Sequence, residues 1–246
     1  MIHPTAFVSP SATIGEHVSI GPFSIIHDGV IIGDHTIIDA YCEIGYFTSL
    51  AHKHELIIGE NSLIRSHTTI YLGSEIGAGL QTGHGVTIRE NMKIGLNLRV
   101  GTSSDIQGDI VMGNYVRIHS NVFIGKGAQL GNFVWLFPYA LLTNDPHPPS
   151  DVCLGVIIED YAAVGARSTI LPGLTLGQHS LVGAHSCVTK NVKPKTLVLG
   201  VPAKPVSSLE SIRLTDDPAT SAYPWPKHFH RGYPEEVIEA WQHEFK

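Results

Sequence analysis

The chain has 246 residues, 43% of them hydrophobic and 15% charged, with a formal net charge of −6. This composition indicates a folded protein with a large core and excludes a disordered chain. The acidic balance, without any run of Lys or Arg, argues against a nucleic-acid partner.

No targeting or membrane segment is recognised in the sequence. The opening MIHPTAFVSP lacks the basic and apolar regions of a signal peptide, and no apolar run approaches the roughly 20 residues of a membrane span. The three cysteines follow no metal-ligand spacing and fit a reducing compartment. We therefore expect a cytoplasmic protein without a membrane partner.

A six-residue repeat begins at Thr5 and reads TAFVSP, SATIGE, HVSIGP and onward, with an aliphatic residue at the fourth position. It is interrupted at residues 47–60, resumes at Asn61, stops after Asn144 and restarts at Tyr161. Among the fourth positions of these hexads, only Thr82 is neither aliphatic nor Met. Gly often follows the aliphatic residue.

The period of six matches neither a helix, which repeats every 3.6 residues, nor a lone strand, which alternates by two. It fits a solenoid in which each hexad is one side of a triangular coil. Successive coils would then stack at about 4.8 Å through parallel hydrogen bonds. The fold class is therefore an all-β solenoid, with the fourth residues filling the axis and Gly or another small residue forming the corners.

Two segments leave the repeat. Residues 145–155 are polar and Pro-rich and are interpreted as a loop insertion, a common place for function on a rigid scaffold. Residues 207–246 form an aromatic tail in which Pro234, followed by two Glu residues, begins a short helix. We expect this helix to pack over the open end of the solenoid or onto a neighbouring subunit.

The sequence resembles the hexapeptide-repeat acyltransferases over about residues 2–206. Its opening IHPTAFVSPSATIGEHVSIGPFSII is similar to UDP-N-acetylglucosamine O-acyltransferases of lipid A synthesis. The GVPAK motif at 200–204 is more like the sugar N- and O-acetyltransferases, and the TND at 143–145 is similar to nucleotide-sugar N-acyltransferases acting on amino-deoxyhexoses. The resemblance implies a left-handed parallel β-helix over residues 1–206, a handedness that the period alone does not give.

The resemblance also implies an activity. An acyl-CoA-dependent N-acyltransferase would transfer an acetyl or other short acyl group to the amine of a dTDP- or UDP-linked amino-deoxy sugar, in cell-surface glycan (lipopolysaccharide O-antigen) biosynthesis. It would act as a homotrimer with active sites between subunits, and no metal is expected. The CoA contacts implied by the resemblance are Gly165, Ala166, Gly183, Ala184 and, for a phosphate, Lys204.

The length of the pantetheine arm, three or four coils at about 4.8 Å each, places the thioester near residues 101–126. In related enzymes a His base stands where this chain has Lys126. His119, Asp105 and Asp145 are therefore expected around the attacking amine. Either His119 is the general base, or the departing thiolate takes the proton and the carboxylates orient the amine.

Further substrate contacts are expected at four polar residues, His84, Glu90, Asn144 and His147. An alternative activity is an O-acyltransferase acting on a sugar or UDP-sugar hydroxyl. A zinc carbonic anhydrase on the same solenoid would need three His ligands, two of them five residues apart, and residues 61–144 contain no such pair. A non-catalytic scaffold is disfavoured by the interrupted repeat.

Overall fold

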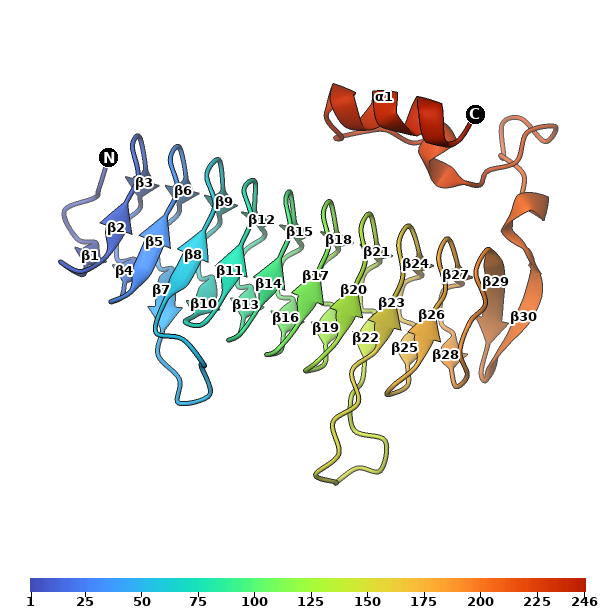
Figure 1. Cartoon of the computed structure of the whole chain (residues 1–246), viewed down its shortest axis with the longest axis horizontal. Helices are drawn as coiled ribbons and strands as arrows, with labels where there is room; N and C mark the ends of the chain where they lie inside the picture. Colours follow the sequence, from blue (N-terminus) through green and yellow to red (C-terminus); the bar gives the residue numbers. More distant parts are fainter.

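The computed structural model describes all residues 1–246 and contains three long parallel sheets wound into a triangular left-handed β-helix (Figure 1). The chain visits the sheets in strict rotation up to β28, so strands adjacent in a sheet are three apart in the chain; only β29 and β30, at the end of the solenoid, depart from this order. The predicted all-β solenoid and its short C-terminal helix are confirmed. Each sheet has one outer face, and consecutive sheets meet at edges that we name the A–B, B–C and C–A edges.

Sheet A contains β3 (Ser19–Ile20), β6 (Ile37–Ile38), β9 (Leu63–Ile64), β12 (Gln81–Thr82), β15 (Arg99–Val100), β18 (Arg117–Ile118), β21 (Trp135–Leu136), β24 (Ala163–Val164), β27 (Leu181–Val182), β29 (Thr196–Gly200) and β30 (Ala203–Ser208). Sheet B contains β1 (Phe7–Val8), β4 (Ile25–Ile26), β7 (Glu43–Tyr46), β10 (Thr69–Tyr71), β13 (Thr87–Ile88), β16 (Asp105–Ile106), β19 (Phe123–Ile124), β22 (Leu141–Leu142), β25 (Thr169–Ile170) and β28 (Cys187–Val188). Sheet C contains β2 (Thr13–Ile14), β5 (Val30–Ile32), β8 (Leu56–Ile58), β11 (Glu75–Ile76), β14 (Lys93–Ile94), β17 (Val111–Met112), β20 (Gln129–Leu130), β23 (Ile157–Ile158) and β26 (Thr175–Leu176).

The aliphatic residue at the fourth position of each hexad points to the axis, as predicted. From Ile20 onward every fourth-position residue is buried, and Val8 and Ile14 in the first coil are partly buried against the same core. Thr82 is also fully buried, and its hydroxyl accepts a hydrogen bond from the backbone N–H of Arg65 at 2.9 Å. The one polar anchor is therefore accommodated by a local hydrogen bond.

The corners of each coil use two hexad positions with different requirements. From His17 onward the left-handed backbone conformation falls on the first residue of each hexad, which is often aromatic or polar, such as His17, Asn97 and Tyr115, with φ near 57°. The Gly after the anchor is required by contact between coils. A Cβ on Gly101 would lie 2.3 Å from the backbone nitrogen of Ser120. Glycine is thus selected here for close approach and not for a positive φ.

Two loops leave the solenoid at the B–C edge, and Figure 1 shows both on the same side. The first joins β7 to β8, and the second joins β22 to β23. Asn91 holds the first loop to the solenoid, because its side chain accepts from His52 N at 2.8 Å and donates to Leu50 O at 2.9 Å. Both loops therefore project from one edge and leave sheet A uncovered.

The tail does not cover the open end of the solenoid, so the first of its two expected positions is wrong. After β30 come two short 3₁₀ segments, Leu209–Ser211 and Trp225–Lys227, and then helix α1 (Glu235–Glu244), which lies along the side of the solenoid (Figure 1). It packs there on a ladder of stacked rings along the C–A edge, formed by Tyr115, Phe133, Tyr161 and His179. This ladder offers a continuous aromatic surface that buries Trp241 of α1. Neither α1 nor any other helix is long and apolar enough to span a membrane.

The axial position of Ile118 gives a stability prediction. Ile118→Asp places an unpaired carboxylate in the core and should cost several kcal/mol, lowering Tm in thermal unfolding followed by circular dichroism. Val111→Asp is the matched control, because Val111 lies on the outer face with 51% of its surface exposed. Equal melting of the two variants would contradict the assigned phase of the repeat.

Candidate functional site

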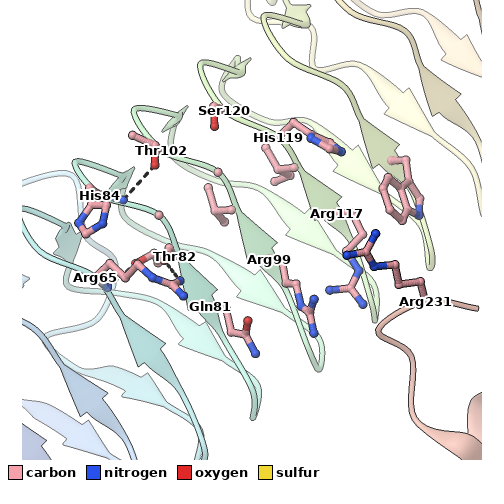
Figure 2. A pocket seen from close by; sticks show the side chains of 15 residues that line it. Arg65, Gln81, Thr82, His84, Arg99, Thr102, Arg117, His119, Ser120 and Arg231 are labelled. Atoms are coloured by element: carbon pink, nitrogen blue, oxygen red, sulfur yellow. Dashed lines mark hydrogen bonds between the residues drawn. The ribbon is translucent and has the colours of Figure 1, made fainter.

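A groove of about 470 Å³ lies on the outer face of sheet A beside the A–B edge (Figure 2). One rim consists of third-position residues on four successive coils, namely Gln81, Arg99, Arg117 and Trp135. The other rim consists of sixth-position residues, namely His84, Thr102 and Ser120. The register of sheet A thus builds both rims from residues 18 apart in the chain.

The groove is open because of what the sequence places at the fifth position of these hexads. Arg65 and His119 occupy that position at the two ends of the groove. Gly83 and Gly101 occupy it on the two coils between them and present no side chain. The floor is therefore backbone, which a ligand can approach closely.

The groove carries positive charge in an acidic chain. Its lining includes four arginines, Arg65, Arg99, Arg117 and Arg231, and contains no Asp or Glu. Arg231 comes from the tail, and Figure 2 shows it beside Arg99 and Arg117 at one end of the groove. Since the whole chain has a net charge of −6, this cluster is a local exception that favours an anionic ligand.

Arg117 is the most constrained of these cations, with 6% of its surface exposed. Its Nη2 donates to the carbonyl of Gly232 at 2.8 Å, and its guanidinium lies 4.7 Å from the ring centre of Tyr233. Its Nη1 is buried without a hydrogen-bond partner. Burial, and then the charge of Arg117, lower the pKa of the neighbouring Arg99.

Leaving a buried cation unpaired beside another cation is costly. A bound anion would pair with both guanidinium groups and remove that cost. The planar fork of arginine matches the oxygens of a phosphate or carboxylate. The groove therefore offers charge and hydrogen-bond donors that suit an anion with several oxygens.

His119 lies at the end of the groove and is half-buried. Its ring stacks on Phe137 with a centroid distance of 4.9 Å and lies 5.7 Å from the ring of Trp135. Burial lowers the pKa of His119 below its ordinary value of 6.5. The imidazole is thus neutral at pH 7 and can accept a proton beside the anion-binding residues.

The other expected residues divide between the groove and sheet B. His84 lines the groove, and its Nδ1 lies 2.9 Å from the hydroxyl of Ser66. Asp105 lies on the outer face of sheet B, where Oδ2 accepts from Gln107 Nε2 at 2.8 Å and Oδ1 is buried without a partner. Glu90 is 1% exposed and pairs with Arg89 at 3.2 Å, so it lies outside the groove.

The residues expected in the second loop lie at the B–C edge, across sheet B from the groove. Asp145 accepts from the backbone N–H groups of His147 and Ser150, and the hydroxyl of Ser150 lowers the pKa of Asp145 further. His147 is exposed, and Asn144 Nδ2 lies 3.5 Å from Cys153 Sγ. One chain alone therefore does not bring the loop residues to His119.

Lys126 is held as a cation at the B–C edge. Its Nζ lies 2.9 Å from Asp109, and this carboxylate raises the pKa of Lys126. No three His, Cys, Asp or Glu side chains come together in an arrangement that could hold a metal ion.

The expected CoA contacts lie on the same A–B edge as His119. Gly165 and Ala166 follow β24, and Gly183 and Ala184 follow β27. Gly183 is three coils beyond His119, or about 14 Å at the spacing of parallel strands. Gly165 is also required by packing, since a Cβ there would lie 2.6 Å from Ala184 N.

Lys204 is exposed on β30, which pairs antiparallel with β29 at the end of the solenoid. It lies beyond the coil of Gly183 and contributes nothing to the groove.

The arginine rim is absent from the sequence-based expectations. Arg99 and Arg117 are isolated along the chain, so they form no basic run. These residues could have been found by comparing positions 18 apart, which is one coil. This spacing places Gln81, Arg99, Arg117 and Trp135 in one row. Arg231 has no comparable signal, because its position depends on how the tail folds back.

Two family models match parts of the repeat. The model described as bacterial transferase hexapeptide (six repeats) matches residues 11–46, and the model for the hexapeptide repeat of succinyl-transferase matches residues 155–190. These two matches lie at opposite ends of the solenoid, so the same repeat type is recognised on both sides of the groove.

Curated relatives match over part of their length. A putative acetyltransferase of Schizosaccharomyces pombe is 36% identical over 90 residues, covering 33% of this chain and 44% of that protein. The bifunctional protein GlmU of Koribacter versatilis is 27% identical over 202 residues, covering 79% and 39%. A 2,3,4,5-tetrahydropyridine-2,6-dicarboxylate N-acetyltransferase of Staphylococcus aureus is 34% identical over 95 residues, covering 39% and 34%. The chain spans less than half the length of these relatives.

Solved structures share the fold. The UDP-N-acetylglucosamine acyltransferase from Campylobacter jejuni aligns with a TM-score of 0.58 and 18% identity, covering 100% of this chain and 83% of that one. The Arabidopsis UDP-N-acetylglucosamine acyltransferase aligns with a TM-score of 0.54 and 17% identity, covering 85% and 74%. At these identities the likeness concerns the fold.

The charge of the groove gives a binding prediction. Arg231→Gln should weaken binding of inorganic diphosphate roughly tenfold in isothermal titration calorimetry, because one charge-assisted hydrogen bond is lost. Arg213→Gln is the control, since Arg213 is an exposed tail arginine outside the groove. Binding to the parent should also weaken as salt is raised. Identical affinities for the parent and both variants would contradict the assignment of the groove.

Proposed function

Because the chain belongs to the hexapeptide-repeat transferases, we propose that it moves an acetyl or other short acyl group from acyl-CoA to the amine of a nucleotide-linked amino sugar. The observation that carries this proposal is the arginine groove ending at His119. A nucleotide-linked sugar has a diphosphate, which suits the arginines, and a sugar attached to it, which would reach the histidine.

The size of the groove supports an acceptor of this class. Its volume of about 470 Å³ lies within the range of small-molecule sites, roughly 300–1,000 Å³. The polar rim formed by His84, Thr102 and Ser120 offers hydrogen bonds to sugar hydroxyls. The rim of Arg99 and Arg117 would hold the diphosphate opposite them.

The donor would lie along the A–B edge. Gly165 and Gly183 keep two coils of this edge free of side chains, and Phe137 occupies the same position on the coil next to His119, three coils from Gly183. The acyl group of a donor bound there would arrive beside the groove. Among the relatives, two are named acetyltransferases, one of them an N-acetyltransferase.

In the proposed reaction the amine nitrogen attacks the thioester carbonyl carbon. A C–N bond forms, the C–S bond breaks, and CoA leaves as its thiolate. The proton released by the amine passes to the neutral imidazole of His119, which returns it to the thiolate. The lowered pKa of His119 suits this role, since the free base is then the populated form at pH 7.

Asp105 and Asp145 are proposed to act from a second copy in a homotrimer. Within one chain they lie on sheet B and in the second loop, away from the groove. If sheet B of one copy faces the A–B edge of another, Asp105 would approach the amine, and its buried, unpartnered Oδ1 would gain a donor. The two carboxylates would orient the amine.

A matched pair of acceptors tests the activity. Nucleotide sugars that carry an amine or a hydroxyl at the same ring position should be incubated with acetyl-CoA, with free thiol and product mass as readouts. The amine should be acylated and the hydroxyl left unchanged. Acylation of the hydroxyl compound alone would replace this proposal with an O-acyltransferase.

The role of His119 predicts both a rate and a pH dependence. His119→Ala should lower kcat by roughly 10²–10⁴-fold, while His17→Ala, an exposed control, should match the parent. Because burial lowers the pKa of His119, the parent kcat should fall, as the base is protonated, only at a pH below that at which an ordinary histidine is protonated.

A mild effect of His119→Ala, together with a larger loss in Asp105→Asn or Asp145→Asn, would instead show that the departing thiolate takes the proton directly. Steady-state kinetics with saturating acetyl-CoA separates these outcomes.

A further inference from the structure

A second hollow adjoins the arginine groove, and Trp135 lines both. Its volume is about 160 Å³. Its lining comes from sheet A and the A–B edge on one side and from the tail on the other, and consists of Trp135, Phe137, Ala163, Tyr223, Trp225 and Phe229. We call this hollow the aromatic pocket.

The pocket exists because a small residue lies beside a large one on the next coil, on the outer face of sheet A. Trp135 pairs with Ala163 in the next coil, so a methyl group stands where a larger side chain would fill the space. The tail then arches over this gap and places the Phe229 ring 5.5 Å from the Trp135 ring, at 84° to it. Phe137 and Phe229 remain 36% and 39% exposed.

The tail serves both hollows at once. Phe229 lines the aromatic pocket and Arg231, two residues later, lines the groove. Along sheet A, Arg117 is one coil from Trp135 and two coils from Ala163, or about 5 and 10 Å at the parallel-strand spacing. An anion held by the arginines would therefore have its attached group within reach of the aromatic pocket.

We propose that the groove and the aromatic pocket form one subsite for a nucleoside diphosphate, with the phosphates on Arg99, Arg117 and Arg231 and the base between Phe137 and Phe229. This inference rests on the proposed function and identifies what holds the nucleotide of the acceptor. The pocket is smaller than a whole-ligand site, roughly 300–1,000 Å³, and so fits one ring system of a larger ligand.

The lining determines how the base would be recognised. Five of the six lining side chains are aromatic, and stacking on such rings tolerates different bases because every base has a flat face. Uridine diphosphate and thymidine diphosphate should therefore bind with similar affinity. The sugar hydroxyls and the amine, and not the base, would then carry the selectivity of the site.

A nucleoside diphosphate group also occurs in CoA. We assign the subsite to the nucleotide sugar, because the edge proposed for CoA runs from His119 toward Gly183, past the pocket and away from the arginine rim. Inhibition by UDP, which resembles part of the acceptor and is not a product of acyl transfer, distinguishes the two sources. UDP should compete with the nucleotide sugar and not with acetyl-CoA, and competition with acetyl-CoA alone would overturn the assignment.

Equilibrium binding tests the base subsite without turnover. Phe229→Ala should weaken UDP binding roughly tenfold and leave inorganic diphosphate binding unchanged, since only the stacked base is lost. Phe137→Ala, on the solenoid side of the pocket, should act in the same way. Phe23→Ala, an exposed ring in the N-terminal coils, is the matched control and should bind both ligands like the parent.

The outcomes separate this inference from the proposed function. If both pocket variants bind UDP as the parent does, the base subsite is overturned, whether or not the amino sugar is acylated. If they lose UDP affinity as expected but no amino sugar is acylated, the subsite stands and the proposed reaction fails. Equal losses of UDP and diphosphate affinity would show a displaced tail and also overturn the base assignment.

Discussion

Everything on the surface of this protein depends on the parallel hydrogen bonding between coils. The N–H of Gly101, for example, donates to the carbonyl of Ile118 at 2.7 Å, and the same contact recurs from coil to coil. These bonds fix a register of 18 residues, so each hexad position becomes a row along the molecule. The axis, the ring ladder at the C–A edge and the arginine rim are three such rows.

A row places the side chains of one hexad position about 5 Å apart on successive coils. This spacing is favourable for some kinds of side chain and unfavourable for others. Stacked rings gain from a repeat near 5 Å, as the distance of 5.1 Å between Tyr115 and Phe133 shows. Guanidinium groups in the same arrangement repel each other, and the pKa of Arg99 is lowered first by burial and then by the charge of Arg117. A solenoid therefore keeps a cationic row only at some cost in stability, and a bound anion can offset that cost.

The sequence was sufficient for the architecture because one physical signal, the buried fourth residue, repeats along nearly the whole chain. It predicted the axial position of Ile118 and the place of the second loop from pattern alone. It also placed His119 and His84 near the same site, since both belong to regular hexads. The contact that requires the glycine after each anchor was not predicted, because contact between coils is a property of the stacked structure and is invisible in a single hexad.

What the pattern missed lies outside a single hexad or outside the repeat. The arginine rim requires residues 18 apart to be compared, and the tail requires tertiary packing on rings from several coils. The tail helix has only a short apolar stripe. The stripe predicts that one face of the helix is buried, but it does not predict which surface covers that face. Asp105 and Asp145 were grouped with His119 by distance along the axis, although in one chain Asp105 lies on sheet B and Asp145 at its far edge.

The close contact at the glycines restricts how such a site can change. Since the fifth-position glycines allow no slack between coils, the distance from the donor edge to the groove can grow or shrink only by whole coils of about 4.8 Å. Insertions at the B–C edge leave that distance untouched, because each loop returns to the same register. The distance between the two substrates can therefore change only in steps of one coil. Related solenoids would differ in this distance by whole coils and not by fractions of one.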